Sequence, residues 1–164
     1  KNGDNKLQYV MLMGQAIHQD AALRTEYSIK AVEAAGIVVD KLFEDRGEWD
    51  RVKGQEKMAT AITQFGDAIE VVFANNDDMA LGAIEALVAA GMTDVPVVGV
   101  DATAPALDAI KNGTLKGTVL NDSDGQAHTS VDSAIKLLNG EAVDVLQWVP
   151  YVKVTPEIFE DFIK

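Results

Sequence analysis

The chain has 164 residues, a formal charge of −12 at pH 7 and no cysteine. This acidity argues against nucleic acid or an anionic membrane surface as a partner, because both would repel the chain. No apolar run approaches the roughly 20 residues that a membrane-spanning helix needs. With 48% apolar residues, the sequence can form a core for one domain, or for slightly more than one lobe of a larger protein.

Apolar periodicity predicts alternating strands and helices through the first half of the chain. The predicted strands are Leu7–Met13, Ile37–Phe43 and Ile69–Ala74. The predicted helices run over about 21–35 and 51–65, with a third that ends near Gly91. Asp20 and Asp50 are candidate N-caps of the first two helices, since a carboxylate there accepts hydrogen bonds from free backbone N–H groups.

The alternation continues through the second half. Strands are predicted at Pro96–Val100 and Thr118–Leu120, followed by an extended segment at Trp148–Val154. Helices are predicted over about 105–111 and 125–138, with a last one after Pro156. Strands separated by helices imply an α/β fold: an open, mostly parallel sheet with helices on both faces.

The stretch 71–82 is the most informative part of the sequence. Four apolar residues form a buried strand, and Asn75, Asn76 and Asp77 follow at the turn into a helix. In a parallel sheet this turn lies at the edge where ligands bind. Two neutral amides and one acid suit a neutral polyhydroxyl ligand better than a phosphate.

Polar or aromatic side chains follow each of the first five predicted strands. The set consists of His18, Asp20, Arg24, Trp49, Asn76, Asp101 and Asn121. Planar polar groups can bind vicinal hydroxyls in pairs, and an indole offers a flat apolar face to the C–H face of a sugar ring. Together these residues suit a neutral pyranose. Taken singly, each residue also fits an ordinary structural role, such as a helix cap, a surface ion pair or a core aromatic.

Signals for catalysis are weak. The sequence contains no nucleophile elbow, Walker loop, dinucleotide-binding glycine motif or zinc-protease motif. His18 and His128 fall on different predicted elements and lack the spacing of metal ligands. A carboxylate pair such as Asp20 with Asp101 could serve a glycosidase, but sheets of this kind bring acids together by chance. We therefore expect a binding protein rather than an enzyme.

Several stretches of the chain resemble the bacterial periplasmic galactose/glucose-binding proteins, the sugar-binding subunits of ABC importers. The matching stretches are Gln8–Leu12, His18–Arg24, Trp49-Asp50, Ala74–Asp77, Val98–Asp101, Gly117–Asp122 and Val149–Val152. The resemblance covers essentially all 164 residues and corresponds to the C-terminal part of such a protein. Lys1–Asp4 does not look like a natural start, so we expect a processed chain or a fragment.

The resemblance implies roles for particular residues. All seven strand-end residues match the type that binds sugar in the family, with Trp49 stacking on the pyranose and His18, Trp49 and Asn121 favouring glucose or galactose. The family also carries a Ca²⁺ loop that resembles an EF-hand. Its later ligands would be Asn2, Asp4, the carbonyl of Lys6, Gln8 and Glu70. The first aspartate of that loop would precede Lys1, which predicts a weakened site.

The resemblance further implies one lobe of a two-lobe fold. Residues 1–121 and 148–164 would form the C-terminal sugar-binding lobe. Residues 122–147 would cross the hinge and supply a helix that packs on the N-terminal lobe, with its apolar face exposed in the isolated chain.

The function implied is the substrate-binding component of a bacterial ABC sugar importer, located in the periplasm or otherwise outside the cytoplasm. It would bind glucose or galactose in a cleft between lobes and present the closed form to a membrane permease, with coupling to a chemoreceptor left open. The alternative is the effector domain of a sugar-responsive repressor of the lactose-repressor type, which shares this fold. An enzyme, a glycosidase or sugar isomerase, is a second and weaker alternative.

Overall fold

A four-stranded parallel sheet forms the centre of the body in the computed structural model, which describes residues 3–163. The strand order is β2-β1-β3-β4. These strands are β1 (Lys6–Met13), β2 (Val38–Arg46), β3 (Val71–Ala74) and β4 (Val97–Val98). Because β1 lies at the centre and each crossover contains a helix, the helices are distributed over both faces of the sheet.

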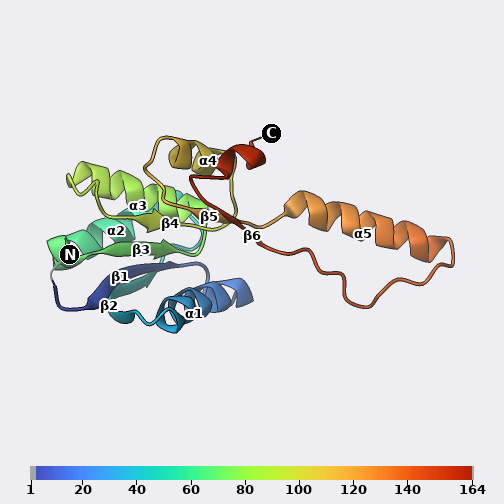
Figure 1. Ribbon diagram of the computed structural model, residues 1–164, viewed down its shortest axis with the longest axis horizontal. Helices are drawn as coiled ribbons and strands as arrows, with labels where there is room; N and C mark the ends of the chain where they lie inside the picture. Colours follow the sequence, from blue (N-terminus) through green and yellow to red (C-terminus); the bar gives the residue numbers. More distant parts are fainter. Residues whose placement is uncertain (1–2, 164) are drawn as a thin grey trace.

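Four helices cover the sheet, with α1 on one face and α2 and α3 on the other (Figure 1). Their bounds are α1 (Gln19–Ala34), α2 (Arg51–Phe65), α3 (Asp77–Ala89) and α4 (Ala104–Lys111). The side chains of β1 alternate between the layers: Tyr9 and Met11 face α1, while Val10 and Leu12 enter the larger core beneath α2 and α3. The expected α/β fold class, with an open parallel sheet and helices on both faces, is confirmed.

The chain returns to this body through a short antiparallel pair, β5 (Thr118–Leu120) with β6 (Val152–Val154). Two isolated parallel bridges, Val98 with Gly117 and Asp101 with Leu120, place β5 beside β4 and the turn that follows it. The last segment therefore lies antiparallel to its neighbour, an arrangement that hydrophobic periodicity alone did not predict.

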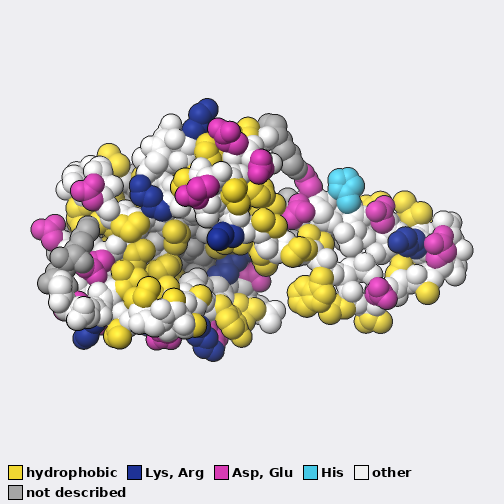
Figure 2. Space-filling view, in the orientation of Figure 1, with side chains coloured by type: hydrophobic (Ala, Val, Ile, Leu, Met, Phe, Trp, Pro, Cys, Tyr) yellow, Lys and Arg dark blue, Asp and Glu magenta, His cyan; other side chains and the backbone are white. Residues whose placement is uncertain are grey.

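Between β5 and β6, the helix α5 (Ser123–Leu138) and the returning segment 139–151 extend away from the body, and together we call them the arm (Figure 1). None of the residues of α5 is buried. Hydrophobic side chains are exposed at several places on the surface of the arm (Figure 2), and Trp148 is 81% exposed. The arm is therefore an amphipathic element that no core layer covers among residues 3–163.

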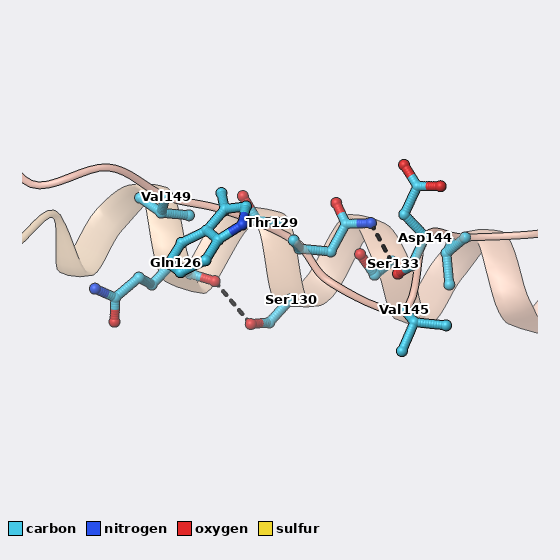
Figure 3. Close-up of a pocket in the computed structure, with 10 residues that line it drawn as sticks. Gln126, Thr129, Ser130, Ser133, Asp144, Val145 and Val149 are labelled. Carbon is cyan, nitrogen blue, oxygen red and sulfur yellow. Dashed lines mark hydrogen bonds between the residues drawn. The ribbon is translucent and has the colours of Figure 1, made fainter. Parts of the chain in front are cut away.

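An open hollow of about 550 Å³ runs between α5 and the returning segment of the arm (Figure 3). Its walls carry hydroxyl and amide groups, and some of these make local hydrogen bonds: Ser130 Oγ donates to the carbonyl of Gln126 at 2.7 Å, and Gln147 Nε2 donates to the carbonyl of Asp144 at 3.1 Å. The returning segment thus lies against the helix without filling the space beside it.

Several boundaries differ from the sequence-based expectation, among them the end of β2, which lies at Arg46 rather than at Phe43. Asp20 does not cap α1, because the helix already begins at Gln19 with His18 at the N-cap, and Asp20 falls in the first turn. β4 is only two residues long. The segment after Pro156 forms a short 3-10 turn at Phe159–Phe162 rather than a full helix. Among the described residues, no helix combines the length and apolar character that a bilayer crossing requires.

Candidate functional site

A shallow, open hollow of about 300 Å³ lies at the carboxyl ends of the central strands. It is lined by His18, Asp20, Arg24, Trp49, Asn76 and Asp101. These are six of the seven residues that the sequence placed at the strand ends, and they come from four separate connections of the chain. The parallel sheet brings them together because its strands all end at the same edge.

Arg24 is the centre of the hollow, with a side chain only 14% exposed. Its guanidinium donates to the carbonyl of Asn75 at 2.8 Å and to Asp101 Oδ1 at 3.3 Å, and Asp20 Oδ2 lies 3.7 Å away. The guanidinium carbon also lies 5.6 Å from the ring centroid of Trp49. Because Arg24 is held from several sides, its remaining N–H groups have a fixed orientation, and this favours paired hydrogen bonding to a ligand.

Trp49 forms the apolar wall of the hollow. Its backbone has a φ of 68°, and the preceding Glu48 has a φ of 55°, so the turn before α2 is left-handed at two non-glycine residues. The indole lies against Gly14, where an added Cβ would come within 2.1 Å of the ring. His18 meets the indole edge-on at 5.4 Å between ring centroids. The ring is therefore held in one orientation, as a stacking surface requires.

Asn76 combines two roles. Its side-chain oxygen caps α3 by accepting from the Met79 N–H at 3.0 Å, and its side-chain nitrogen donates to the carbonyl of Trp49 at 3.1 Å. The helix-cap explanation is thus correct for Asn76, and the same side chain also fixes the turn that carries the tryptophan. For Asp50 the cap is confirmed as well, since its side chain accepts from the Lys53 N–H at 2.9 Å.

Asp101 sits on a strained turn, with a φ of 122° followed by 55° at Ala102. Its backbone N–H donates to the carbonyl of Val119 at 2.8 Å, which fixes the turn to β5. Burial raises the pKa of the Asp101 carboxyl, while the charge of Arg24 opposes that rise.

Asn121 is the one predicted residue outside the hollow. It lines the neighbouring depression together with Asp101, and its side-chain oxygen accepts from Gln126 Nε2 at 2.7 Å.

Two residues of this network were not among the seven predicted sugar-binding residues. Asn75 is only 2% exposed, and its side-chain oxygen accepts from the Gly14 N–H at 3.1 Å, below the indole. The hydroxyl of Tyr151 lies 3.3 Å from an Arg24 nitrogen, although the two residues are 127 positions apart. The paired amides at 75–76 gave a signal for Asn75, whereas nothing in the local sequence could reveal the contact of Tyr151.

The expected Ca²⁺ ligands lie at the opposite end of the sheet from the hollow, and Asn2 falls outside the described residues. Glu70 is nearly buried, and its carboxylate accepts from the Gln8 N–H at 3.1 Å. Asp4 accepts from the Lys6 N–H at 2.9 Å. The oxygen chemistry fits a hard cation such as Ca²⁺. Among residues 3–163, however, no three His, Cys, Asp or Glu side chains gather as a metal site, so most of the oxygens would have to come from amides and carbonyls.

The fold and the hollow together define a ligand-binding lobe of the open α/β type. Residues 1–142 match the family model described as a periplasmic binding protein domain. The chain belongs to this family of periplasmic binding proteins.

Curated relatives extend the comparison over nearly the whole chain. It is 40% identical, over 99% of its length, to the D-galactose/methyl-galactoside binding periplasmic protein MglB of Haemophilus influenzae. It is 37% identical, over 97% of its length, to a putative rhizopine-binding protein of Rhizobium meliloti. In each case the match covers 52% of the relative, so the chain spans about half the length of these proteins.

Solved structures agree with the fold. An ABC transporter solute binding protein from Bacillus halodurans with bound myo-inositol superposes with a TM-score of 0.88 at 38% identity, covering 96% of this chain and 54% of the other. A relative from Actinobacillus succinogenes with bound D-allose has the same TM-score of 0.88 at 22% identity, which supports the fold alone.

Proposed function

We propose that this chain is the C-terminal lobe of a substrate-binding protein of an ABC sugar importer, and that it supplies half of a site for glucose or galactose. The observation that carries the proposal is the single hollow formed by an oriented indole, a fixed guanidinium and two carboxylates. The 40% identity to a galactose-binding relative supports the choice of hexose. The function is binding, not catalysis.

The chemistry of the hollow suits a neutral ring with several hydroxyls. Hydrogen bonds between hydroxyls and charged groups contribute about 1.5–3 kcal/mol each when shielded from water. The hollow is open on one side, so an isolated lobe would leave much of the ligand solvated. We therefore expect that half of the site binds far more weakly than the whole.

The two-lobe arrangement is also part of the proposal. The predicted boundaries are residues 1–121 and 148–164 for this lobe, and 122–147 for the hinge crossing and a helix that packs on the N-terminal lobe. The exposed apolar side chains of the arm support this arrangement, because water-exposed residues such as Leu138 would gain most from a partner surface. The match to about half of each relative supports it too.

A calorimetric titration tests the ligand class. The intact two-lobe protein is titrated with glucose, galactose, ribose, arabinose and myo-inositol. We expect tight hexose binding that is lost in Trp49→Ala and Asp101→Ala, while Asp108→Ala, an exposed acid on the adjacent helix, binds as the wild type does. Failure to bind any of these compounds would refute the sugar assignment.

A cyclitol is the second candidate ligand. The relative from Bacillus halodurans that is 38% identical holds myo-inositol, which presents a ring of hydroxyls without a ring oxygen. Preference for myo-inositol over both hexoses in the same titration would select this alternative.

The proposed setting is the periplasm or another extracytoplasmic space, with a membrane permease as the first partner and a chemoreceptor as the second. The rival assignment is the effector domain of a lactose-repressor-type regulator. The full gene separates the two, because a repressor begins with a DNA-binding helix-turn-helix and an exported protein begins with a signal sequence. Turnover of a chromogenic sugar by the full-length protein would instead identify an enzyme.

We also propose that the oxygens near Glu70 and Gln8 take part in a structural Ca²⁺ site, which contributes charge neutralisation at the amino end of β1. In a Ca²⁺ titration we expect the melting temperature to rise with Ca²⁺ in the wild type and to respond less in Glu70→Gln. Equal responses of the two proteins would remove Glu70 from the ligand set.

A further inference from the structure

Directly after the Asn75-Asn76 pair stands a carboxylate that does not reach the hollow. Asp77, the first residue of α3, is fully buried. Its own N–H donates to the carbonyl of Val100 at 2.8 Å. A buried carboxylate is costly unless it is well hydrogen-bonded, so its partners indicate what it stabilises.

Both carboxylate oxygens of Asp77 accept hydrogen bonds from the segments around Asp101. Oδ1 accepts from the hydroxyl of Thr118 at 2.7 Å, and Oδ2 accepts from the backbone N–H of Thr103 at 2.9 Å. Thr118 Oγ1 in turn accepts from the N–H of Ala102 at 3.2 Å. The carboxylate thus holds, directly or through one hydroxyl, the two backbone amides that follow Asp101.

Gly99 leaves room for this carboxylate beside the end of β4. A Cβ added at Gly99 would lie 2.4 Å from Asp77 Oδ1, so the glycine lets the end of β4 approach the charged group. The turn at 101–103, which Asp77 holds, has a positive φ at Asp101 and Ala102. Such a backbone conformation is strained and persists only when the surrounding structure fixes it.

We propose that Asp77 is a positioning residue of the sugar site: its carboxylate fixes the strained turn at 101–103, and thereby aims the Asp101 side chain at Arg24 and at the ligand. The inference rests on the proposed function for its binding readout. In this proposal Asp77 does not contact the ligand itself, but it determines how well Asp101 is oriented toward the ligand.

A dependence on pH follows from the same geometry. Burial raises the pKa of Asp77 from its usual 3.8 to about 6, although the hydrogen bonds from Thr118 and Thr103 oppose the rise. Among the charged groups nearby, the Asp101 carboxylate across the turn raises it further. The adjacent strands β4 and β5 contain no ionisable side chain, and Asp108 of α4 is exposed to solvent.

A protonated Asp77 can no longer accept hydrogen bonds from both Thr118 and Thr103. The turn at 101–103 therefore loosens as the pH falls through about 6.

The test is the pH dependence of hexose affinity in the intact two-lobe protein, measured by calorimetry between pH 5 and pH 8. We expect the wild type to weaken as the pH falls through about 6. The isosteric Asp77→Asn removes the charge and one acceptor, so it should bind about tenfold more weakly at pH 8 and lose the step near pH 6. Asp78→Asn removes the same charge from the next residue, which is exposed, and should keep the wild-type affinity and step.

A second pair of variants tests the network if Asp77→Asn fails to fold. Thr118→Val removes the bridging hydroxyl, so we expect weaker binding and a step moved to higher pH, because one of the bonds that lowers the pKa of Asp77 is gone. Thr118→Ser keeps the hydroxyl and should restore both the wild-type affinity and the wild-type pH of the step. If residue 118 had a purely structural role, Thr118→Val would not change the pH at which the hexose affinity falls.

The outcomes separate the two proposals. A wild type that binds no sugar at any pH refutes the proposed function, while carboxyl-carbon NMR of Asp77 and amide exchange at Thr103 still report on the network. A wild type that binds, with Asp77→Asn within twofold of it and an unchanged step, overturns the positioning role alone.

Discussion

The body and the arm obey the same rules of local structure but differ in what stabilises them. In the body, Leu12, Met58 and Met79 are completely buried between the sheet and its helices. In the arm, α5 has the same length as α1 and a capped N-terminus, yet none of its residues is buried. Helix formation therefore follows from periodicity and caps in both regions, whereas burial depends on a partner layer that only the body contains.

The largest expected contrast comes from one substitution made in both regions. Leu12→Ala should lower the free energy of unfolding of this chain by about 2–5 kcal/mol, because it leaves a cavity in the core. Leu138→Ala, at a side chain that is 87% exposed, should change it by less than about 0.5 kcal/mol. Urea unfolding measures both. A large cost for Leu138→Ala would mean that the arm already packs on something in the isolated chain.

The second effect is a pH dependence of the stability of the body. The pKa of Asp77 is raised from 3.8 to about 6, so the folded state binds a proton that the unfolded state has lost in this interval. This contribution to stability is complete below pH 3.8 and is lost as the pH rises through about 6. The loss amounts to at most about 3 kcal/mol.

Comparing wild type with Asp77→Asn isolates this contribution. Urea unfolding at pH 4.5 and pH 7.5 should show the wild type losing stability relative to the variant as the pH rises. An unchanged difference between the two pH values would mean that the pKa of Asp77 is not raised.

Two glycines, one in the body and one in the arm, allow the two regions to be compared by substitutions of intermediate effect. A Cβ at Gly82 in α3 would lie 2.0 Å from the carbonyl oxygen of Arg51 in α2, so Gly82→Ala should force these helices apart and cost about 1–3 kcal/mol. Gly140 in the arm has open space around it, and its backbone has a φ of 76°. Gly140→Ala should therefore cost about 1 kcal/mol. Thermal unfolding of the two variants gives the ranking, and the reverse order would contradict it.

The smallest effect is expected at the surface of the body. Arg51 pairs with Glu85 across α2 and α3 at 2.6 Å, but both side chains are more than 40% exposed. Glu85→Gln should change the free energy of unfolding by less than about 1 kcal/mol, and less still in high salt. A salt-independent cost above that value would show that the pair is shielded from water.

Local patterns predicted most of the fold. The helix 51–65 forms with the predicted bounds, and the helix that was expected to end near Gly91 forms over 77–89. The predicted boundaries of elements were wrong where tertiary contacts determine the boundary. The strand at 96–100 is short because its chain bends at once into the turn that Asp77 holds, and the last segment is antiparallel because it returns from the arm.

The strand-end residues could be predicted because a parallel sheet gathers the ends of its strands at one edge, whatever the side chains are. That rule gave six of the residues in the hollow. It could not give Gly14, which allows the indole of Trp49 to lie flat, nor Tyr151, which meets Arg24 from the far end of the chain. These contacts depend on separations that no local pattern records.

The sequence by itself determined the alternating elements, the acidic character and the polar residues that follow the strands, since each depends on neighbours a few positions apart. The tertiary structure decided which of those residues meet. It buried Asp77 and raised its pKa, made Arg24 the centre of the hollow, and left the apolar face of the arm in water. The physical reason is that burial and electrostatic coupling arise from groups brought together across the whole chain, from Arg24 to Tyr151.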